Sequence, residues 1–342
     1  MTAQLPPPPD AAMAPSSAAV GRSDRLDANG SGLAADAAPP VSEVKHQDVL
    51  LGEALELTFP ASDPIAVFVP ERSRHTHQSD NLSARELARS KIMSAFDNKV
   101  AIVTGGSSGI GRAAALGFAA QGAKVLVTGR RAAILDEMVA GHPNIKSLVA
   151  DAAEPADAAR TIATAIDTWG RLDVLVNNAG AGALLPLAEA TAEQITRIFA
   201  VNVVGPSLLA AAALPHLGVA KGAIVNISST FGHKPGAGLS HYAASKAALE
   251  HLTRCWALEL APLGVRINAV AAGPTESGAL TGMMGLSPEH AAVIEEAERE
   301  QIPLKRRGFP NDVARWIIHL ADPASDWMTG QVIAVDGGLG LM

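Results

Sequence analysis

Seven short apolar runs, most of them rich in β-branched residues, recur along the chain from Lys99 onward. They occupy residues 100–104, 125–128, 145–149, 174–177, 223–227, 265–270 and 332–335. Most are continuous rather than alternating in polarity, as expected of strands that are buried on both faces. Segments of helical length at 110–121, 155–168, 191–214, 241–262 and 310–321 lie between them. This alternation predicts an α/β fold, a doubly wound parallel sheet with helices on both faces.

Composition supports a large packed core and excludes several kinds of protein. Hydrophobic residues make up 48% of the 342 residues and charged residues 18%, so global disorder is excluded. The net charge of −7 comes without a basic tract, which argues against a nucleic-acid partner. Cys255 is the only cysteine, so an intramolecular disulfide or a cysteine-based metal cluster is excluded, and no metal site is expected.

No run in the sequence approaches the ~20 consecutive apolar residues of a membrane span. The first residues also lack a basic region followed by an apolar one, which a secretory signal would require. We therefore expect no membrane contact and a soluble cytoplasmic protein.

Residues 1–95 differ from the rest of the chain. They open with Pro6–Pro9 and are rich in Ala, Pro, Ser and Gly, so we expect a largely disordered, irregular extension. A more apolar stretch at 49–69 is a candidate docking peptide. Ser83 and Glu86 form a capping box that predicts a short helix near 83–95. A single folded domain is then expected over 96–342.

A glycine-rich turn joins the first predicted strand to the helix after it. Glycines allow a tight turn and let backbone N–H groups approach a pyrophosphate at the helix N-terminus. A strand before, a helix after and a second strand within ~30 residues are the context that a dinucleotide site requires. The residues expected to contact the cofactor here are Gly105, Ser107, Ser108, Gly109, Ile110 and Gly111.

The spacing T-G-x-x-x-G-x-G resembles that of the short-chain dehydrogenase/reductase family, and the resemblance covers about residues 97–340. It implies a Rossmann-like domain that binds a nicotinamide dinucleotide and oxidises CH–OH or reduces C=O groups. In the family, an acidic residue after the third strand bonds the adenine, and Asp151-Ala152 matches it, although Asp151 is equally suited to cap the next helix. The N-N-A-G motif beside the cofactor corresponds to Asn178, Ala179 and Gly180 with the preceding Asn177.

The end of the second predicted strand bears on the choice between NADP(H) and NAD(H). An acidic residue there would bond the ribose 2′-hydroxyl and repel a 2′-phosphate. This chain has Gly129 followed by Arg130 and Arg131, and guanidinium groups suit a phosphate. We therefore expect NADP(H). NAD(H) stays open as the alternative, because Ser108 stands where NADP(H)-preferring relatives often carry a second basic residue.

The only tyrosine of the chain, Tyr242, precedes Lys246 by four residues, so on a helix both share one face. A nearby ammonium is expected to lower the pKa of the phenol and make it a general acid/base. The resemblance implies that Ser229 orients the substrate oxygen, with Ser228 as its neighbouring competitor. It also implies that Asn202 completes a catalytic tetrad by holding a water on Lys246.

The loop after the sixth strand is expected to meet the nicotinamide carboxamide through Gly273 and Ser277. The family usually has Pro-Gly where this chain has Ala272-Gly273. Residues 278–302 follow as a substrate loop with an apolar lining from Leu280, Met283, Met284 and Leu286. Its helical stretch 291–301 reads as a solvated acidic face. The last strand resembles one that packs at a subunit interface in the family.

These features predict an NADP(H)-dependent oxidoreductase that acts on a small-molecule carbonyl or secondary alcohol, in a homodimer or homotetramer. Two alternatives stay open, an NAD-dependent alcohol or sugar dehydrogenase and a non-enzymatic dinucleotide-binding sensor. Enoyl reduction is disfavoured because the tyrosine-to-lysine interval typical of that branch of the family is longer than the one here. The substrate cannot be chosen from the fold.

Overall fold

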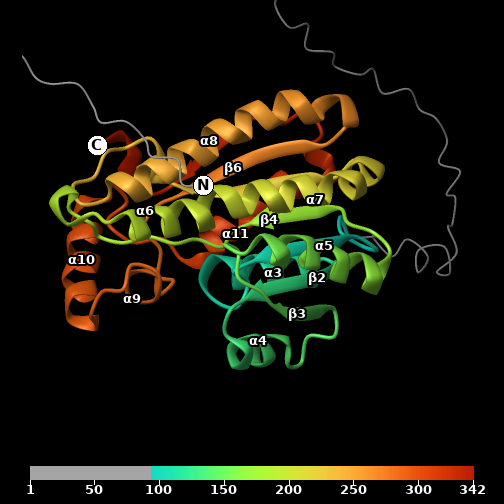
Figure 1. Ribbon diagram of the computed structural model, residues 1–342, viewed down its shortest axis with the longest axis horizontal. Coiled ribbons are helices and arrows are strands. Elements are labelled where there is room, and N and C mark those ends of the chain that lie inside the picture. The colour runs from blue at the N-terminus through green and yellow to red at the C-terminus, as the bar shows by residue number, and fades with distance from the viewer. Residues whose placement is uncertain (1–93) are drawn as a thin grey trace, which may run out of the picture. The chain divides into compact units, whose positions relative to one another are not determined.

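Seven parallel strands form one sheet in the order β3-β2-β1-β4-β5-β6-β7 (Figure 1). The strands are β1 (Val100–Thr104), β2 (Lys124–Gly129), β3 (Ile145–Val149), β4 (Val174–Asn177), β5 (Ala223–Ser229), β6 (Arg266–Ala272) and β7 (Val332–Val335). The doubly wound parallel sheet is confirmed. The strand order reverses between β1 and β4, and such a reversal opens a crevice at the carboxyl ends of the strands.

The computed structural model describes residues 94–342. Three predicted features lie outside the described residues. They are the N-terminal extension up to residue 93, the candidate docking peptide at 49–69, and residues 83–93 of the predicted short helix. Residues 95–98 form a turn, and Phe96 is buried against Phe118 with the ring centroids 5.0 Å apart.

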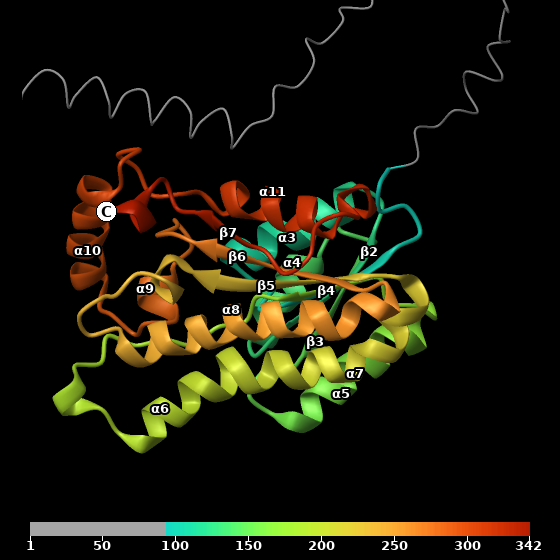
Figure 2. The same ribbon diagram turned by 90° about the horizontal axis from the view of Figure 1, so that it is seen from above.

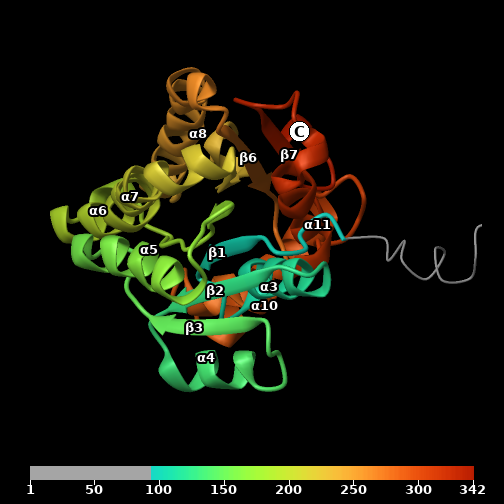
Figure 3. The same ribbon diagram turned by 90° about the vertical axis from the view of Figure 1, so that its right-hand side faces the viewer.

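Two hydrophobic clusters cover the two faces of the sheet, because successive side chains of each strand point to opposite sides. In β1, Ala101 and Val103 join one cluster, while Val100 and Ile102 join the other. The helices α3 (Gly109–Ala120), α4 (Ala132–Val139) and α11 (Pro310–Ala321) bury their apolar sides in the first cluster. The second cluster contains side chains of α5 (Pro155–Trp169), α7 (Gly205–Ala220) and α8 (Ser240–Leu260). Figure 3 shows the sheet with α3 and α11 on one side of it and α5, α7 and α8 on the other.

The helix expected over 191–214 is interrupted. The structure has α6 (Ala192–Phe199), a π-helical turn at Ala200–Val204 and then α7. The Thr191 hydroxyl and the Gln194 side chain cap α6 reciprocally, which fixes its start. A π-helical turn inserts one extra residue per turn and is frequent at functional sites.

Within the described residues, the stretch Ala192–Ala220 is long and apolar enough to cross a membrane by length and composition alone. Its second half, α7, packs against α5 and β4 in the helical layer, and Leu209, Ala213 and Leu217 are fully buried or nearly so. The apolar character of this stretch is therefore that of a core helix.

Two shorter helices, α9 (Ala279–Gly282) and α10 (Pro288–Gln301), complete the domain. Figure 2 shows them beyond the carboxyl ends of β5, β6 and β7. They come from the segment between β6 and α11, so the substrate loop predicted over 278–302 is mostly helical.

Candidate active site

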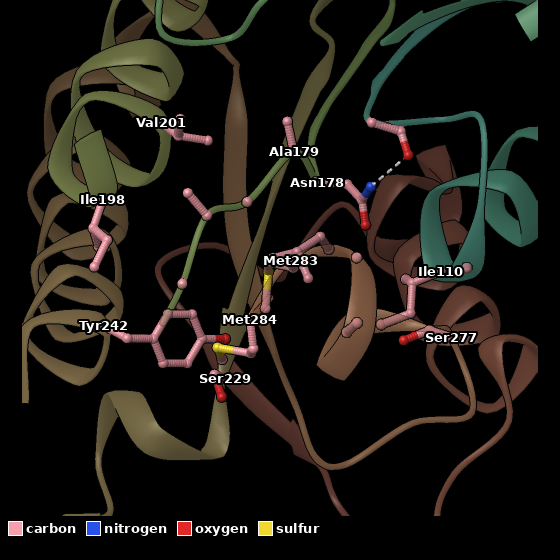
Figure 4. A pocket seen from close by; sticks show the side chains of 18 of the residues that line it. Ile110, Asn178, Ala179, Ile198, Val201, Ser229, Tyr242, Ser277, Met283 and Met284 are labelled. Carbon is pink, nitrogen blue, oxygen red and sulfur yellow. Dashed lines mark hydrogen bonds between the residues drawn. The ribbon is translucent and has the colours of Figure 1, made fainter. Parts of the chain in front are cut away.

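A cleft of about 1440 Å³ lies at the carboxyl ends of the strands. All but two of the residues expected to catalyse the reaction or to bind the cofactor line it. Gly111 and Asn202 do not, because both are buried behind its wall. Figure 4 shows Ile110, Asn178 and Ser277 at one end of the cleft, and Tyr242, Met284 and Ser229 at the other.

The glycine turn between β1 and α3 is built so that only glycine fits at several places. Gly105 and Gly109 have φ of +63° and +52°, values that L side chains rarely adopt. A Cβ on Gly111 would lie 2.4 Å from both the Asn178 Nδ2 and the Gly105 carbonyl oxygen. Ser108 is the N-cap of α3, yet its side chain makes no capping hydrogen bond. The first backbone N–H groups of α3 therefore face the cleft with their positive partial charge.

The N-N-A-G segment is tied directly to this turn. The Thr104 hydroxyl accepts hydrogen bonds from the backbone N–H groups of Asn178 and Ala179, each at 3.0 Å. The Asn178 side-chain amide donates to the carbonyl oxygens of Thr104 at 2.8 Å and Gly105 at 3.2 Å. The ends of β1 and β4 are thus locked together at the reversal of strand order, with Gly180 exposed beside them.

Two arginines mark one end of the cleft. Arg130 and Arg131 follow Gly129 at the end of β2, both are exposed, and both line the cleft. Arg131 is also the N-cap of α4, but its side chain makes no capping hydrogen bond. Neither guanidinium has a hydrogen-bonded or ionic partner among the described residues, so both can meet an anionic ligand.

Asp151 is held in a fixed orientation between β3 and α5, with Ala152 beside it in the cleft wall. Its carboxylate accepts hydrogen bonds from the Ala153 N–H at 2.9 Å and from Arg197 at 2.9 Å. Burial opposes ionisation, but these two partners outweigh it and hold the pKa of Asp151 below its usual range. Arg197, from α6, is a cleft residue that the sequence reasoning missed.

Both serines line the cleft, but Ser229, rather than Ser228, forms the hydrogen bond with Tyr242. Successive residues of β5 point to opposite sides, as the sequence argument required. The Ser228 hydroxyl donates to Glu250 Oε1 at 2.7 Å on the far side. Ser229 ends β5, is 6% exposed, and its hydroxyl accepts a hydrogen bond from the Phe231 N–H at 3.2 Å.

Tyr242 is nearly buried near the start of α8. Burial raises the pKa of its phenol, and the hydrogen-bonded Ser229 hydroxyl lowers it by less. The expectation that Lys246 lowers this pKa is therefore wrong for the protein as described here, because desolvation of the phenolate dominates. A phenol with a raised pKa remains protonated at neutral pH and is suited to donating a proton.

Lys246 lies one helical turn after Tyr242 and is 4% exposed. Its ammonium donates to the Ile227 carbonyl oxygen at 2.8 Å and lies 5.9 Å from the centroid of the Tyr242 ring. Burial lowers the pKa of Lys246 to about 8, and the charge of Glu250 opposes this effect. The lysine therefore titrates close to physiological pH.

Asn202 belongs to the π-helical turn and is fully buried. Its side chain accepts from the Ala181 N–H at 2.8 Å and donates to the Ala181 carbonyl oxygen at 2.8 Å. It also donates to the Ser245 hydroxyl at 2.9 Å. The side chain thus clamps the segment after β4 against α8, which places Gly180 and Ala181 beside Lys246.

The loop after β6 closes the site from the other side. Gly273 approaches Asp336 so closely that a Cβ would lie 2.6 Å from the Asp336 Cα. Ser277 contacts the glycine turn, 2.9 Å from where a Cβ of Gly109 would lie, and its hydroxyl donates to the Thr275 carbonyl oxygen at 3.2 Å. Ala272 continues β6 in regular pairing with Val335, so the missing proline does not disturb the strand.

The α9 segment lies over the tyrosine. A Cβ on Gly182 would lie 2.7 Å from Met284 Sδ and 3.1 Å from Tyr242 Cδ2, and a Cβ on Gly180 would lie 3.5 Å from Met283 Sδ. Figure 4 shows both methionine side chains inside the cleft. Leu280 also lines it, but Leu286 does not.

Arg307 is a further cleft residue that the sequence reasoning missed. Its guanidinium is 3% exposed and pairs with Glu276 at 2.8 Å, Glu295 at 2.6 Å and Glu298 at 2.9 Å. Two of these acids belong to α10, so the interpretation of that helix as a solvated acidic face is wrong for them. The sequence signal for this ion-pair cluster was the spacing of Glu295 and Glu298, three residues apart on α10, with Arg306 and Arg307 shortly after them.

Comparison with known proteins agrees with this geometry. The family described as enoyl-(acyl carrier protein) reductase matches residues 105–340. A putative ketoacyl reductase 2 of granaticin polyketide synthase from Streptomyces violaceoruber is 40% identical over 71% of this chain and 96% of its own length. The 3-oxoacyl-(acyl-carrier-protein) reductase FabG of Thermotoga maritima is 37% identical over 71% and 98%.

Among solved structures, a short-chain dehydrogenase/reductase of unknown function from Caenorhabditis elegans, crystallised with its cofactor, superposes with a TM-score of 0.68. It is 33% identical, over 72% of this chain and 97% of that protein. The chain belongs to the short-chain dehydrogenase/reductase family of oxidoreductases.

Proposed function

We propose that the protein is an NADP(H)-dependent reductase that transfers hydride between nicotinamide and a carbonyl carbon. The observation that carries the proposal is the meeting of Ser229, Tyr242 and Lys246 at one end of a cleft. The other end of that cleft is a glycine turn at a helix N-terminus.

The residues present fit a dinucleotide. Gly105 and Gly109 would receive the pyrophosphate on backbone N–H groups, since the turn leaves no room for side chains. Asp151 would accept from the adenine. The free guanidinium groups of Arg130 and Arg131 support a 2′-phosphate, and hence NADP(H).

When bound, the cofactor supplies the hydride and, once oxidised, a positively charged ring. Tyr242 would donate the proton that the substrate oxygen needs as hydride arrives, and its raised pKa favours this direction of reaction. Ser229 would hold the same oxygen by a hydrogen bond that strengthens as charge develops. Lys246 would contact the ribose and return a proton to Tyr242, while Asn202 fixes the neighbouring backbone.

The substrate class that we favour is a ketone on an acyl chain, such as a 3-oxoacyl thioester. Met283, Met284 and Leu280 give that part of the cleft an adaptable apolar lining. Two similar proteins carry ketoacyl or oxoacyl reductase in their names. The four-residue interval between Tyr242 and Lys246 favours this carbonyl reduction over enoyl reduction.

We also propose that the enzyme is a homo-oligomer. Trp327, Leu258 and Val219 are 99%, 81% and 89% exposed, and residues of the edge strand β7 are only partly covered. Exposed apolar side chains in such number are typical of subunit contacts. Sedimentation velocity should find a dimer or tetramer, and a monomer at micromolar concentration would contradict this part of the proposal.

The cofactor preference is tested by fluorescence titration with NADPH and NADH at matched salt. We expect tighter binding of NADPH and a loss of about tenfold or more in Arg130→Ala, from a lost charge-assisted hydrogen bond. Arg315→Ala, on the exposed side of α11, is the matched control. Tighter binding of NADH would turn the proposal toward an alcohol dehydrogenase, and binding of neither would favour a protein without this activity.

The reaction is tested with acetoacetyl and crotonyl thioesters in the presence of the preferred cofactor. We expect oxidation of the cofactor with the ketone only. Tyr242→Phe should reduce kcat by roughly 10²–10⁴-fold, the usual contribution of a general acid. A Tyr242→Phe enzyme with unchanged ketone reduction would overturn the assignment.

A further inference from the structure

A buried carboxylate lies behind the proposed catalytic groups, and the reaction outlined above does not use it. Glu250 is on α8, one helical turn after Lys246, and is 3% exposed. Its Oε1 accepts a hydrogen bond from the Ser228 hydroxyl at 2.7 Å and lies 3.4 Å from His233 Nδ1. A Cβ on Gly232 would lie only 2.4 Å from the same oxygen.

The three neighbours of this carboxylate come from one segment. Ser228, Gly232 and His233 belong to β5 and the turn that follows it, and that segment also carries Ser229. Because glycine at 232 is what leaves space for the carboxylate, the turn is shaped around Glu250. The contact therefore joins α8, which carries the tyrosine and lysine, to the turn that carries the serine.

The charges around Glu250 show what it can do. A buried carboxylate is costly unless a cation faces it. Lys246 lies one helical turn before it on α8, with its ammonium bonded to the Ile227 carbonyl oxygen, and His233 Nδ1 lies 3.4 Å away from the turn after β5. Asp336, from the loop after β7, binds Thr230 Oγ1 at 3.0 Å on the other side of that turn. The charge of Glu250 raises the pKa of Lys246 against the effect of burial.

We propose that Glu250 is a positioning residue for the reduction, whose buried carboxylate supplies a counter-charge to the Lys246 ammonium and holds the Ser229 turn against α8. The inference rests on the proposed function for the roles of Lys246 and Ser229. It explains why the acid Glu250 is buried one helical turn after the buried Lys246.

Two variants separate the charge from the hydrogen bond. Glu250→Gln keeps the size and the contact with Ser228 but removes the charge, whereas Ser228→Ala removes the contact and keeps the charge. The measurement is the pH dependence of kcat/KM for ketone reduction, which reports the ionisations of the enzyme before it binds substrate. We expect the alkaline limb to move down by about one pH unit in Glu250→Gln, because an isolated ammonium loses its proton more easily. The limb should stay in place in Ser228→Ala.

A second readout does not depend on activity. NMR titration of protein labelled with ¹³C-lysine gives the pKa of Lys246 directly, with Lys246→Arg used to assign the signal. We expect this pKa to fall in Glu250→Gln and to stay near the wild-type value in Glu250→Asp, which keeps the charge. An unchanged pKa of Lys246 in Glu250→Gln would overturn the inference, whether or not activity falls.

The two readouts also separate this inference from the proposed function. If the pKa of Lys246 falls in Glu250→Gln but the alkaline limb does not move, the counter-charge is real and the catalytic role given to Lys246 fails. If Glu250→Gln does not fold, Glu250→Asp remains informative. If the alkaline limb moves down in Glu250→Asp, which keeps the charge, as far as expected for Glu250→Gln, the electrostatic role is contradicted.

Discussion

Replacing Lys246 with methionine should stabilise the fold while removing activity. In the folded protein the pKa of Lys246 is about 8, against 10.5 for an ordinary lysine. At about 1.4 kcal/mol per unit, keeping this side chain charged costs the folded state about 3 kcal/mol. Methionine has a similar shape and no charge, so it avoids that cost. It also loses the hydrogen bond to the Ile227 carbonyl oxygen, which is worth about 1 kcal/mol. The pKa of about 8 already includes the attraction of Glu250, so the expected net gain at pH 7 is about 2 kcal/mol.

The sign of the pH dependence makes the prediction specific. Because the folded-state pKa of Lys246 is lower than the unfolded one, the folded chain binds fewer protons between pH 8 and 10.5. The wild-type free energy of unfolding should then gain from this group as pH rises through that window. Below pH 8 the cost of the buried charge is complete, and above 10.5 it is gone. The advantage of Lys246→Met should accordingly shrink from pH 7 to pH 10.

The assay is urea denaturation of both proteins at pH 7 and pH 10, at one fixed protein concentration because the proposed self-association would also contribute to stability. Lys146→Met, an exposed position beside Trp169, is the control and should change the free energy of unfolding by less than about 1 kcal/mol. The reasoning is refuted if Lys246→Met is less stable than wild type at pH 7. It is equally refuted if the gain is the same at both pH values.

Three further predictions concern residues around the cleft. Gly111→Ala should destabilise the fold by about 1–3 kcal/mol and abolish dinucleotide binding, since its Cβ would overlap Asn178; denaturation and NADPH titration test both effects. Asn202→Ala should cost about 1–3 kcal/mol in urea denaturation, because both backbone groups of the half-buried Ala181 lose their partner, and a change below about 0.5 kcal/mol would contradict the clamp. Arg307→Met should leave the acids of α10 repelling one another, so limited proteolysis of residues 278–302 should become faster than in wild type, and unchanged cleavage would speak against this role.

Much of the fold was predictable because its physical causes are local. Apolar runs mark strands that are buried on both faces, and all seven occur within two residues of their predicted ends. The glycine turn was predictable because Gly105 and Gly109 adopt positive φ, which glycine tolerates far better than other residues. The π-helical turn at Ala200–Val204 could not be foreseen, because nothing in an apolar stretch distinguishes it from an ordinary helix.

The sequence predicted residues that the structure brings into one cleft, but it did not predict their energetics. Spacing placed Ser229, Tyr242 and Lys246 together, yet the direction of the pKa shift of Tyr242 depends on desolvation, which only three-dimensional packing determines. The same holds for Glu250 and Arg307. A charged residue in a helix or loop is usually solvated, and only the neighbouring elements decide that these two are buried.

The burial of Tyr242 in the cleft has a practical consequence, since the chain holds no other tyrosine. A tyrosine-selective reagent can modify one position per chain, so the label incorporated counts active sites in any preparation. Because Tyr242 is nearly buried in a cleft that Met284 also lines, the rate of labelling measures how often the cleft admits the reagent. A single chemical reaction with a single residue would thus report, without substrate or cofactor, the frequency at which this cleft opens.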